Sequence, residues 1–183
     1  MHPSPRAYPG QWLPNSSDRV IADVMSLDSM LLKRGITSFF NWDDWGTIPE
    51  FAYAEFKRVV YGVADPLCLA VSELNERGVT PNFHSARLDG ANAAITILGH
   101  STYPIFAFAE PIEFKSCHLC FVDHEPLSRV IETSFPGTSI ATAGELNRQL
   151  AETDLTKLDA SELEQIEYWK PKTVGEVAFN WWD

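Results

Sequence analysis

The sequence predicts an α+β fold, with N-terminal helices, a central antiparallel β-meander and short C-terminal helices in one domain. The chain has 183 residues, of which 45% are hydrophobic and 12% aromatic, and this is enough to build a sizeable core. Apolar residues recur at helical spacing early in the chain, favour strands in the middle and follow capping boxes near the end. An order of helices, then strands, then helices is typical of an α+β domain rather than of βαβ units.

The N-terminal part is expected to be an arm followed by helices. Residues 1–16 hold four of the 12 prolines and show no apolar period, so we expect a flexible arm there and a single α+β domain over residues 17–183. Helical apolar spacing, proline near two starts and glycine at two stops then predict three helices. They span residues 17–34, 49–61 and 65–77, with Pro49 at the first helical position of the second.

The middle of the chain changes to strand-forming residues. Residues 93–121 are rich in Ile and Phe, several of which alternate with small or polar neighbours, and residues 99–102 are typical of a turn. This pattern predicts a meander of about three strands. Residues 127–135 fit either a strand or a helix, because periodicity alone does not separate the two for a short apolar run.

Three short helices are predicted to close the chain. Capping boxes occur at residues 142–145, 161–164 and 173–176, and Pro171 separates the second helix from the last. In the last helix, Phe179 and Trp182 are three residues apart and would share one side. Such a helix is expected to pack on the body of the protein, with a partner surface as the alternative.

The charge of the chain excludes several classes of function. Its 25 acidic and 14 basic residues give a net charge of −11 and a pI near 4.8, which argues against binding nucleic acid. No apolar run approaches the roughly 18 residues that a membrane span needs, and no signal peptide is visible. Three cysteines suit a reducing compartment. We therefore expect a cytoplasmic protein that binds neither nucleic acid nor membrane.

The acidity is unevenly distributed along the chain. Residues 1–90 carry a net charge of −3, whereas residues 91–183 carry −8. A negative field over the second half would attract a basic protein partner and speed its association. The alternative is that the charge serves only solubility.

One segment resembles a metal site in composition. Cys117, His118, Cys120 and His124 are close in sequence and are of the types that hold zinc. If the segment is a strand, Cys117 faces one side while His118 and Cys120 face the other, which splits the ligands. We therefore expect no metal and no cofactor, although the sequence does not decide whether these four residues form any site.

The sequence contains no local signature of a catalytic nucleophile. Nucleophile-elbow, phosphate-loop, dinucleotide and zinc-protease motifs are all missing from it. Any of His84, His100, His118 and His124 could act as a base, but only the fold can bring one to a nucleophile. No catalytic residue is therefore assigned from the sequence.

Two segments are candidates for partner recognition. The first is Trp42-Asp43-Asp44-Trp45, which combines two large aromatic side chains with two charges in a predicted loop. The alternative for its tryptophans is burial in the core. The second is the acidic turn that contains Asp123 and Glu125. Both segments would suit a basic partner.

The C-terminal tail carries a resemblance to a known class of proteins. Residues 154–183 read DLTKLDASELEQIEYWKPKTVGEVAFNWWD, and the succession YWKP, VGEV, FNWWD resembles the tail of small bacterial immunity proteins of contact-dependent or polymorphic toxin systems. The resemblance covers about the last 30 residues. It implies a protein that binds a cognate toxin domain, often a nuclease with a basic face, and neutralises it by occluding its active site.

Two other functions stay open at this point. One is a small cytoplasmic hydrolase that uses a histidine with a cysteine or an aspartate. A structure in which these side chains meet in one pocket would support it. The other is a regulatory binding module whose partner is not a toxin. The sequence does not indicate the oligomeric state.

Overall fold

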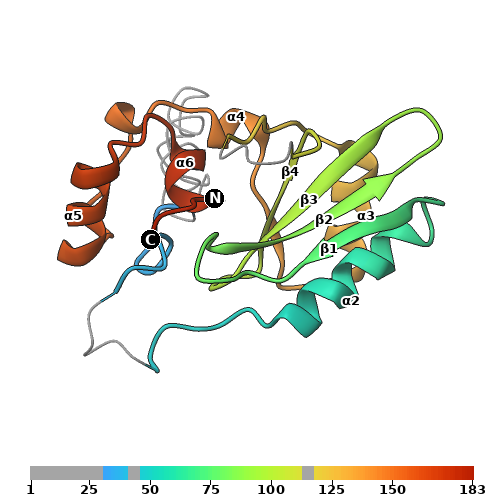
Figure 1. The fold of residues 1–183 in the computed structure, drawn as a ribbon, viewed down its shortest axis with the longest axis horizontal. Coiled ribbons are helices and arrows are strands. Elements are labelled where there is room, and N and C mark those ends of the chain that lie inside the picture. Colours follow the sequence, from blue (N-terminus) through green and yellow to red (C-terminus); the bar gives the residue numbers. More distant parts are fainter. Residues whose placement is uncertain (1–30, 41–45, 113–117) are drawn as a thin grey trace, which may run out of the picture.

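A five-stranded sheet forms the centre of the fold. The computed structural model describes residues 31–40, 46–112 and 118–183. Strands β1 to β4 form an antiparallel meander, and β5 pairs with β4 in parallel, so the sheet order is β1-β2-β3-β4-β5 (Figure 1). With the helices around it, this sheet confirms the α+β class. The strands are β1 (Ala70–Asn75), β2 (Phe83–Asp89), β3 (Ala94–His100), β4 (Ile105–Ala109) and β5 (Ser139–Ile140).

The helices pack on both faces of the sheet. In Figure 1, α2 and α3 lie towards one end of the view and α5 and α6 towards the other. No described helix is long and apolar enough to cross a membrane. The helices are α2 (Tyr53–Ala64), α3 (Glu125–Ser134), α4 (Ala143–Leu146), α5 (Ala160–Trp169) and α6 (Val174–Ala178), with a 3₁₀ turn, η2, at Leu150–Glu152.

Strand β4 shows how the sheet separates two apolar cores. All five of its residues are buried. Ile105, Ala107 and Ala109 face a core formed with residues 31–36, α4 and α6, whereas Phe106 and Phe108 face a core formed with α2 and α3. This alternation follows from the period of two in a strand, and burial on both faces explains why β4 is continuously apolar.

Gly99 in β3 allows α2 to approach the sheet closely. A Cβ placed on Gly99 would overlap the ring of Phe56, which is fully buried. The Phe56 ring stacks in turn on Phe106 of the neighbouring strand, with the centroids 6.1 Å apart. The residue that looked like a turn former in the sequence therefore belongs to a strand, and its missing side chain makes room for the helix.

Two predictions for the first half need correction. The predicted helix at residues 65–77 is wrong, because a turn there leads into β1, which pairs with β2. The helix predicted at 49–61 begins four residues later, at Tyr53, because the Phe51 backbone N–H bonds instead to Ser101 O. The sequence analysis also missed β2. Residues 127–135, which were left open, lie in helix α3 apart from its C-cap, Phe135.

One of the three predicted C-terminal capping boxes is present as predicted, and the other two differ. The box at Thr142 and Glu145 is present, with each side chain bonded to the other residue's backbone N–H. The cap of α5 is Asp159 with Glu162, two residues before the predicted box. Thr173 caps α6, but Glu176 Oε2 accepts from Lys172 N rather than from the cap residue.

The last helix is shorter than predicted. It ends at Ala178, so Phe179 and Trp182 do not share a helical side. The residues beyond it still pack on the body. The ring of Trp181 contacts that of Phe83 in β2 edge-on, with the ring centroids 5.0 Å apart. The ring centroids of Trp182 and Phe39 are 6.4 Å apart. The expectation that this tail packs on the body is therefore confirmed. The arm predicted at 1–16 and the helix predicted at 17–34, up to residue 30, lie outside the described residues.

Candidate functional site

The acidic turn predicted as a recognition site is engaged within the chain. Asp123 Oδ1 accepts from the backbone N–H of Ala143, 2.8 Å away, at the start of α4. Glu125, in the first turn of α3, forms an ion pair with Arg129 one turn later. These contacts are structural. Both acids are also exposed, and their role in recognition stays a prediction. The other predicted site, Trp42, Asp43, Asp44 and Trp45, lies outside the described residues.

The metal-like segment does not assemble a site in the described part of the chain. Cys117 lies outside that part. His118 and Cys120 are exposed on either side of the buried Leu119, and they belong to no strand. His124 Nδ1 accepts from Leu127 N, which caps α3. Among residues 31–40, 46–112 and 118–183, no group of three or more His, Cys, Asp or Glu side chains could hold a metal ion.

Two other histidines are buried and bonded to backbone atoms. His100 Nε2 lies 2.7 Å from Ile36 O and donates to it, while Nδ1 accepts from Thr102 N and Tyr103 N. Burial lowers the pKa of His100 to about 4. His84 Nδ1 accepts from Arg77 N, and burial lowers the pKa of His84 as well. Rings held in this way stabilise loops, so they are poor candidates for a catalytic base.

Helix α5 is unusual in what it buries and what it exposes. Its one fully buried side chain is a carboxylate, Glu162. Three of the five exposed large hydrophobic side chains in the described part of the chain lie on this helix: Leu163 at 40%, Tyr168 at 75% and Trp169 at 37% exposure. We call these three residues, with the exposed acids Glu164 and Glu167, the α5 surface.

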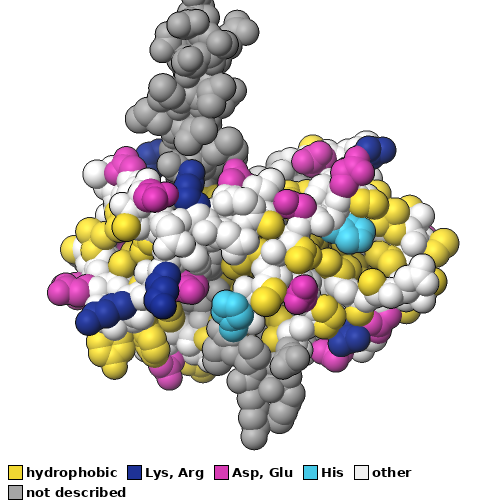
Figure 2. All heavy atoms as spheres, turned by 90° about the horizontal axis from the view of Figure 1, so that it is seen from above, with side chains coloured by type: hydrophobic (Ala, Val, Ile, Leu, Met, Phe, Trp, Pro, Cys, Tyr) yellow, Lys and Arg dark blue, Asp and Glu magenta, His cyan; other side chains and the backbone are white. Residues whose placement is uncertain are grey.

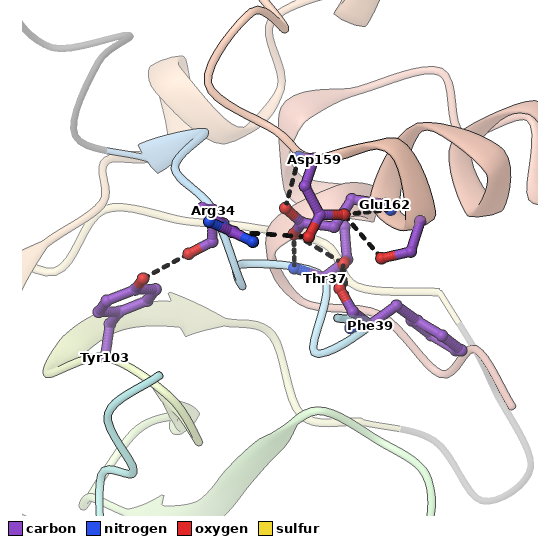
Figure 3. A network of polar contacts seen from close by, with 7 residues as sticks. Arg34, Thr37, Phe39, Tyr103, Asp159 and Glu162 are labelled. Atoms are coloured by element: carbon purple, nitrogen blue, oxygen red, sulfur yellow. Dashed lines mark hydrogen bonds and ion pairs between the residues drawn. The ribbon is translucent and has the colours of Figure 1, made fainter. Parts of the chain in front are cut away.

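Glu162 anchors the α5 surface to the N-terminal part of the described chain. Its Oε1 accepts from Thr37 N at 3.2 Å and from Thr37 Oγ1 at 2.8 Å, and its Oε2 accepts from Asp159 N (Figure 3). Arg34 Nε lies 3.5 Å from Asp159 Oδ2 in the same network. Burial raises the pKa of Glu162, although these backbone and hydroxyl donors act in the opposite direction. Trp169 follows Glu162 by seven residues and therefore lies on the same side of α5, where it is partly exposed, whereas Leu163 and Tyr168 lie on other sides.

A pocket of about 320 Å³ adjoins the end of α5. Trp169 and Trp182 lie in parallel planes there, with ring centroids 6.4 Å apart. The interaction is possible because Lys170 adopts a left-handed conformation that ends α5 and turns the chain towards α6. We call this hollow the tryptophan pocket. Its lining includes Phe121, Trp169, Glu176, Phe179, Trp181 and Trp182.

Exposed apolar surface and the acidic end of the chain coincide. Figure 2 shows hydrophobic side chains at the left end of the molecule, the end at which Figure 1 places α5, with charged side chains around them. Residues 145–183 contain nine acidic and four basic residues. An apolar patch with charges at its rim is typical of a protein-binding surface.

Tyr168 and Trp169 belong to the tail that carries the resemblance, but they were not predicted as a site. The sequence did contain a feature that could have indicated this site. Two large aromatic residues precede Lys170 and Pro171, where a helix is expected to end. What the sequence did not show is that α5 buries a carboxylate in place of its apolar residues.

Comparison of the chain with protein-family models, with curated proteins and with solved structures finds no match. The candidate site is therefore argued from its own geometry.

Proposed function

We propose that the chain is an immunity (antitoxin-like) protein, which binds a cognate bacterial toxin domain in the cytoplasm and neutralises it by occluding its active site. The observation that carries the proposal is the α5 surface. Exposed Tyr168 and Trp169, whose ring centroids are 5.2 Å apart, provide an aromatic patch at the end of the helix, of the kind that dominates the energy of protein interfaces. Exposed Leu163 lies on another side of the same helix.

The charge supports a basic protein as the partner. The net charge of −11 and the excess of acids over residues 145–183 would steer a basic toxin domain to this end of the molecule and repel nucleic acid. A toxin that acts on nucleic acid needs a basic substrate cleft. An acidic protein that fills such a cleft competes with the substrate for the same charges.

The environments of three of the four candidate histidines favour binding over hydrolysis, whereas exposed His118 lines the tryptophan pocket. The hydrolase alternative requires a histidine that meets a nucleophile in a pocket. His84 and His100 have their ring nitrogens bonded to backbone atoms, and His124 caps a helix. The same environments favour a regulatory binding module over the hydrolase as well.

Co-expression with the toxin-domain product of the adjacent open reading frame tests the proposal. We expect the two proteins to co-purify and the toxin to lose activity at a one-to-one ratio. The substitution Tyr168→Ala should weaken the complex about tenfold or more, because it removes an exposed aromatic anchor. Tyr61→Ala on α2 is the matched control, since Tyr61 is also exposed (54%) but lies far from α5 in sequence.

Two outcomes would contradict the proposal. One is a wild-type protein that neither binds nor protects against the neighbouring toxin domain. The other is an equal loss of affinity in the Tyr168→Ala and Tyr61→Ala variants, which would remove the α5 surface as the contact.

A further inference from the structure

The tryptophan pocket combines aromatic walls with one carboxylate. Trp169, Trp181 and Trp182 contribute the aromatic surface, and Glu176 is the one acidic residue among the described lining residues, which include His118 but no Lys or Arg. Glu176 Oε2 accepts from Lys172 N at 2.6 Å, so the carboxylate is held in place. A carboxylate accepts several hydrogen bonds, and this one leaves capacity for another donor.

We propose that the tryptophan pocket binds the cationic side chain, an arginine or a lysine, of a basic protein partner. The identity of that partner as a toxin domain rests on the proposed function. The cation would lie against the tryptophan faces, where the ring quadrupole attracts positive charge, and would pair with Glu176.

The chain's own cations show the same chemistry elsewhere. Lys33 Nζ lies 3.7 Å from the Tyr103 ring centroid, Lys57 Nζ lies 4.7 Å from that of Tyr53, and Arg58 lies over the Phe135 ring. These are the cation–π contacts found in the described residues, and they use Tyr and Phe. Tryptophan is the strongest acceptor of such contacts, and no Lys or Arg of the described residues lies over a tryptophan of the pocket.

The size and charge of the pocket disfavour other occupants. A volume of about 320 Å³ is at the lower end for ligand sites, which suits one side chain better than a large molecule. An anion would be repelled by Glu176, and an apolar side chain would desolvate that carboxylate without pairing it. Arginine fits better than lysine, because a planar guanidinium both stacks on an indole and donates two parallel bonds to a carboxylate.

The pocket can be tested without any protein partner. The probe is N-acetyl-arginine amide, and its control is N-acetyl-citrulline amide, which has the same shape without the charge. Titration at constant ionic strength is followed by tryptophan fluorescence and by amide chemical shifts. We expect the arginine amide to bind in the millimolar range and the citrulline amide to bind at least about threefold more weakly.

Two pairs of variants locate the binding. Trp169→Leu and Glu176→Gln should each weaken the arginine amide at least about threefold. Tyr61→Leu and Glu164→Gln are the controls, since both residues are exposed and do not belong to the described lining of the pocket. Thermal unfolding of all four shows whether each is folded. Equal binding of the two amides, or no binding of either, would overturn the inference.

A second measurement separates this inference from the proposed function. If the arginine amide binds and the neighbouring toxin domain does not, the pocket stands and the immunity role fails. If the wild-type protein neutralises the toxin and Trp169→Leu does so equally well, the immunity role stands and the cation pocket is overturned as its contact.

Discussion

Glu162 replaces an apolar side chain at the buried position of α5. A carboxylate out of contact with water is costly unless donors surround it. Three donors do so here: Thr37 N, Thr37 Oγ1 and Asp159 N. The residue therefore adds directional bonds to the apolar packing of α5, whose Ile166 lies against the core.

Removing this carboxylate is expected to destabilise the protein strongly. Glu162→Ala leaves the Thr37 donors buried without a partner, at a cost of about 3 kcal/mol in the free energy of unfolding. Glu164→Ala, an exposed position on the same helix, should change it by no more than about 0.5 kcal/mol. Urea denaturation of both variants measures the difference. Equal stabilities would show that the Glu162 contacts contribute nothing net.

His100 is expected to make stability depend on pH. The folded protein holds His100 neutral with a pKa of about 4, below the usual 6.5, because burial disfavours the charge and Nδ1 already accepts two backbone N–H groups. The unfolded chain takes up the proton first. The contribution of neutral His100 to the free energy of unfolding is therefore full above about pH 6.5, where it amounts to about 3 kcal/mol. It is lost as the pH falls to about 4.

A histidine substitution isolates this effect from that of Glu162, whose raised pKa acts in the opposite direction in acid. His100→Asn should flatten the fall in unfolding free energy between pH 6.5 and pH 4 relative to the wild-type protein. Urea denaturation of both proteins at several pH values gives the two slopes. Parallel slopes in the variant and the wild-type protein would assign the pH dependence to other groups.

Among the helices and strands, features encoded by neighbouring residues were predicted more reliably than those that depend on distant contacts. The capping box at Thr142 and Glu145 is encoded within four residues, and it is present in the structure. Strand β1 is not encoded locally. Its Val71 and Leu74 also fit a helix, and only pairing with β2 makes the segment a strand.

The candidate site also combines features that are local in the sequence with features that depend on distant contacts. The two aromatic residues at the end of α5 are visible in the sequence, whereas the position of the helix depends on the bonds that Glu162 makes to Thr37, 125 residues away. A contact over that distance leaves no local pattern. The sequence could therefore provide the residues of the site but not their grouping.

Two glycines on the short helices provide a matched pair of predictions. A Cβ on Gly175 of α6 would overlap the Phe121 ring and lie 3.0 Å from Leu146 O, so Gly175→Ala should destabilise the protein by about 1–3 kcal/mol. A Cβ on Gly144 of α4 would meet nothing closer than 4.0 Å, and Gly144→Ala should stabilise it by about 0.5–1 kcal/mol. Thermal unfolding distinguishes the two signs. Two shifts in the same direction would contradict the packing described for α6.

For the whole molecule, the net charge sets the expected kinetics of association. A charge of −11 should accelerate the encounter with a basic toxin domain, and salt should screen this attraction. We expect the association rate constant to fall about tenfold or more as salt rises from low to well above physiological strength, with a smaller change in the dissociation rate. Stopped-flow fluorescence measures both. A salt-independent association rate would remove charge steering from the proposed function.

The bonds from Thr37 to Glu162 and from Asn180 to the Thr37 carbonyl join positions 125 and 143 residues apart, whereas the meander joins neighbours. Closing the longer loops costs more chain entropy, so these bonds are expected to form after the rate-limiting step of folding. Glu162→Gln should then speed unfolding and leave the folding rate nearly unchanged, while Leu88→Ala in β2 should slow folding. Chevron measurements check this, and a slower folding rate in Glu162→Gln would contradict it. One buried carboxylate would thus govern how long the native state lasts rather than how fast it is reached.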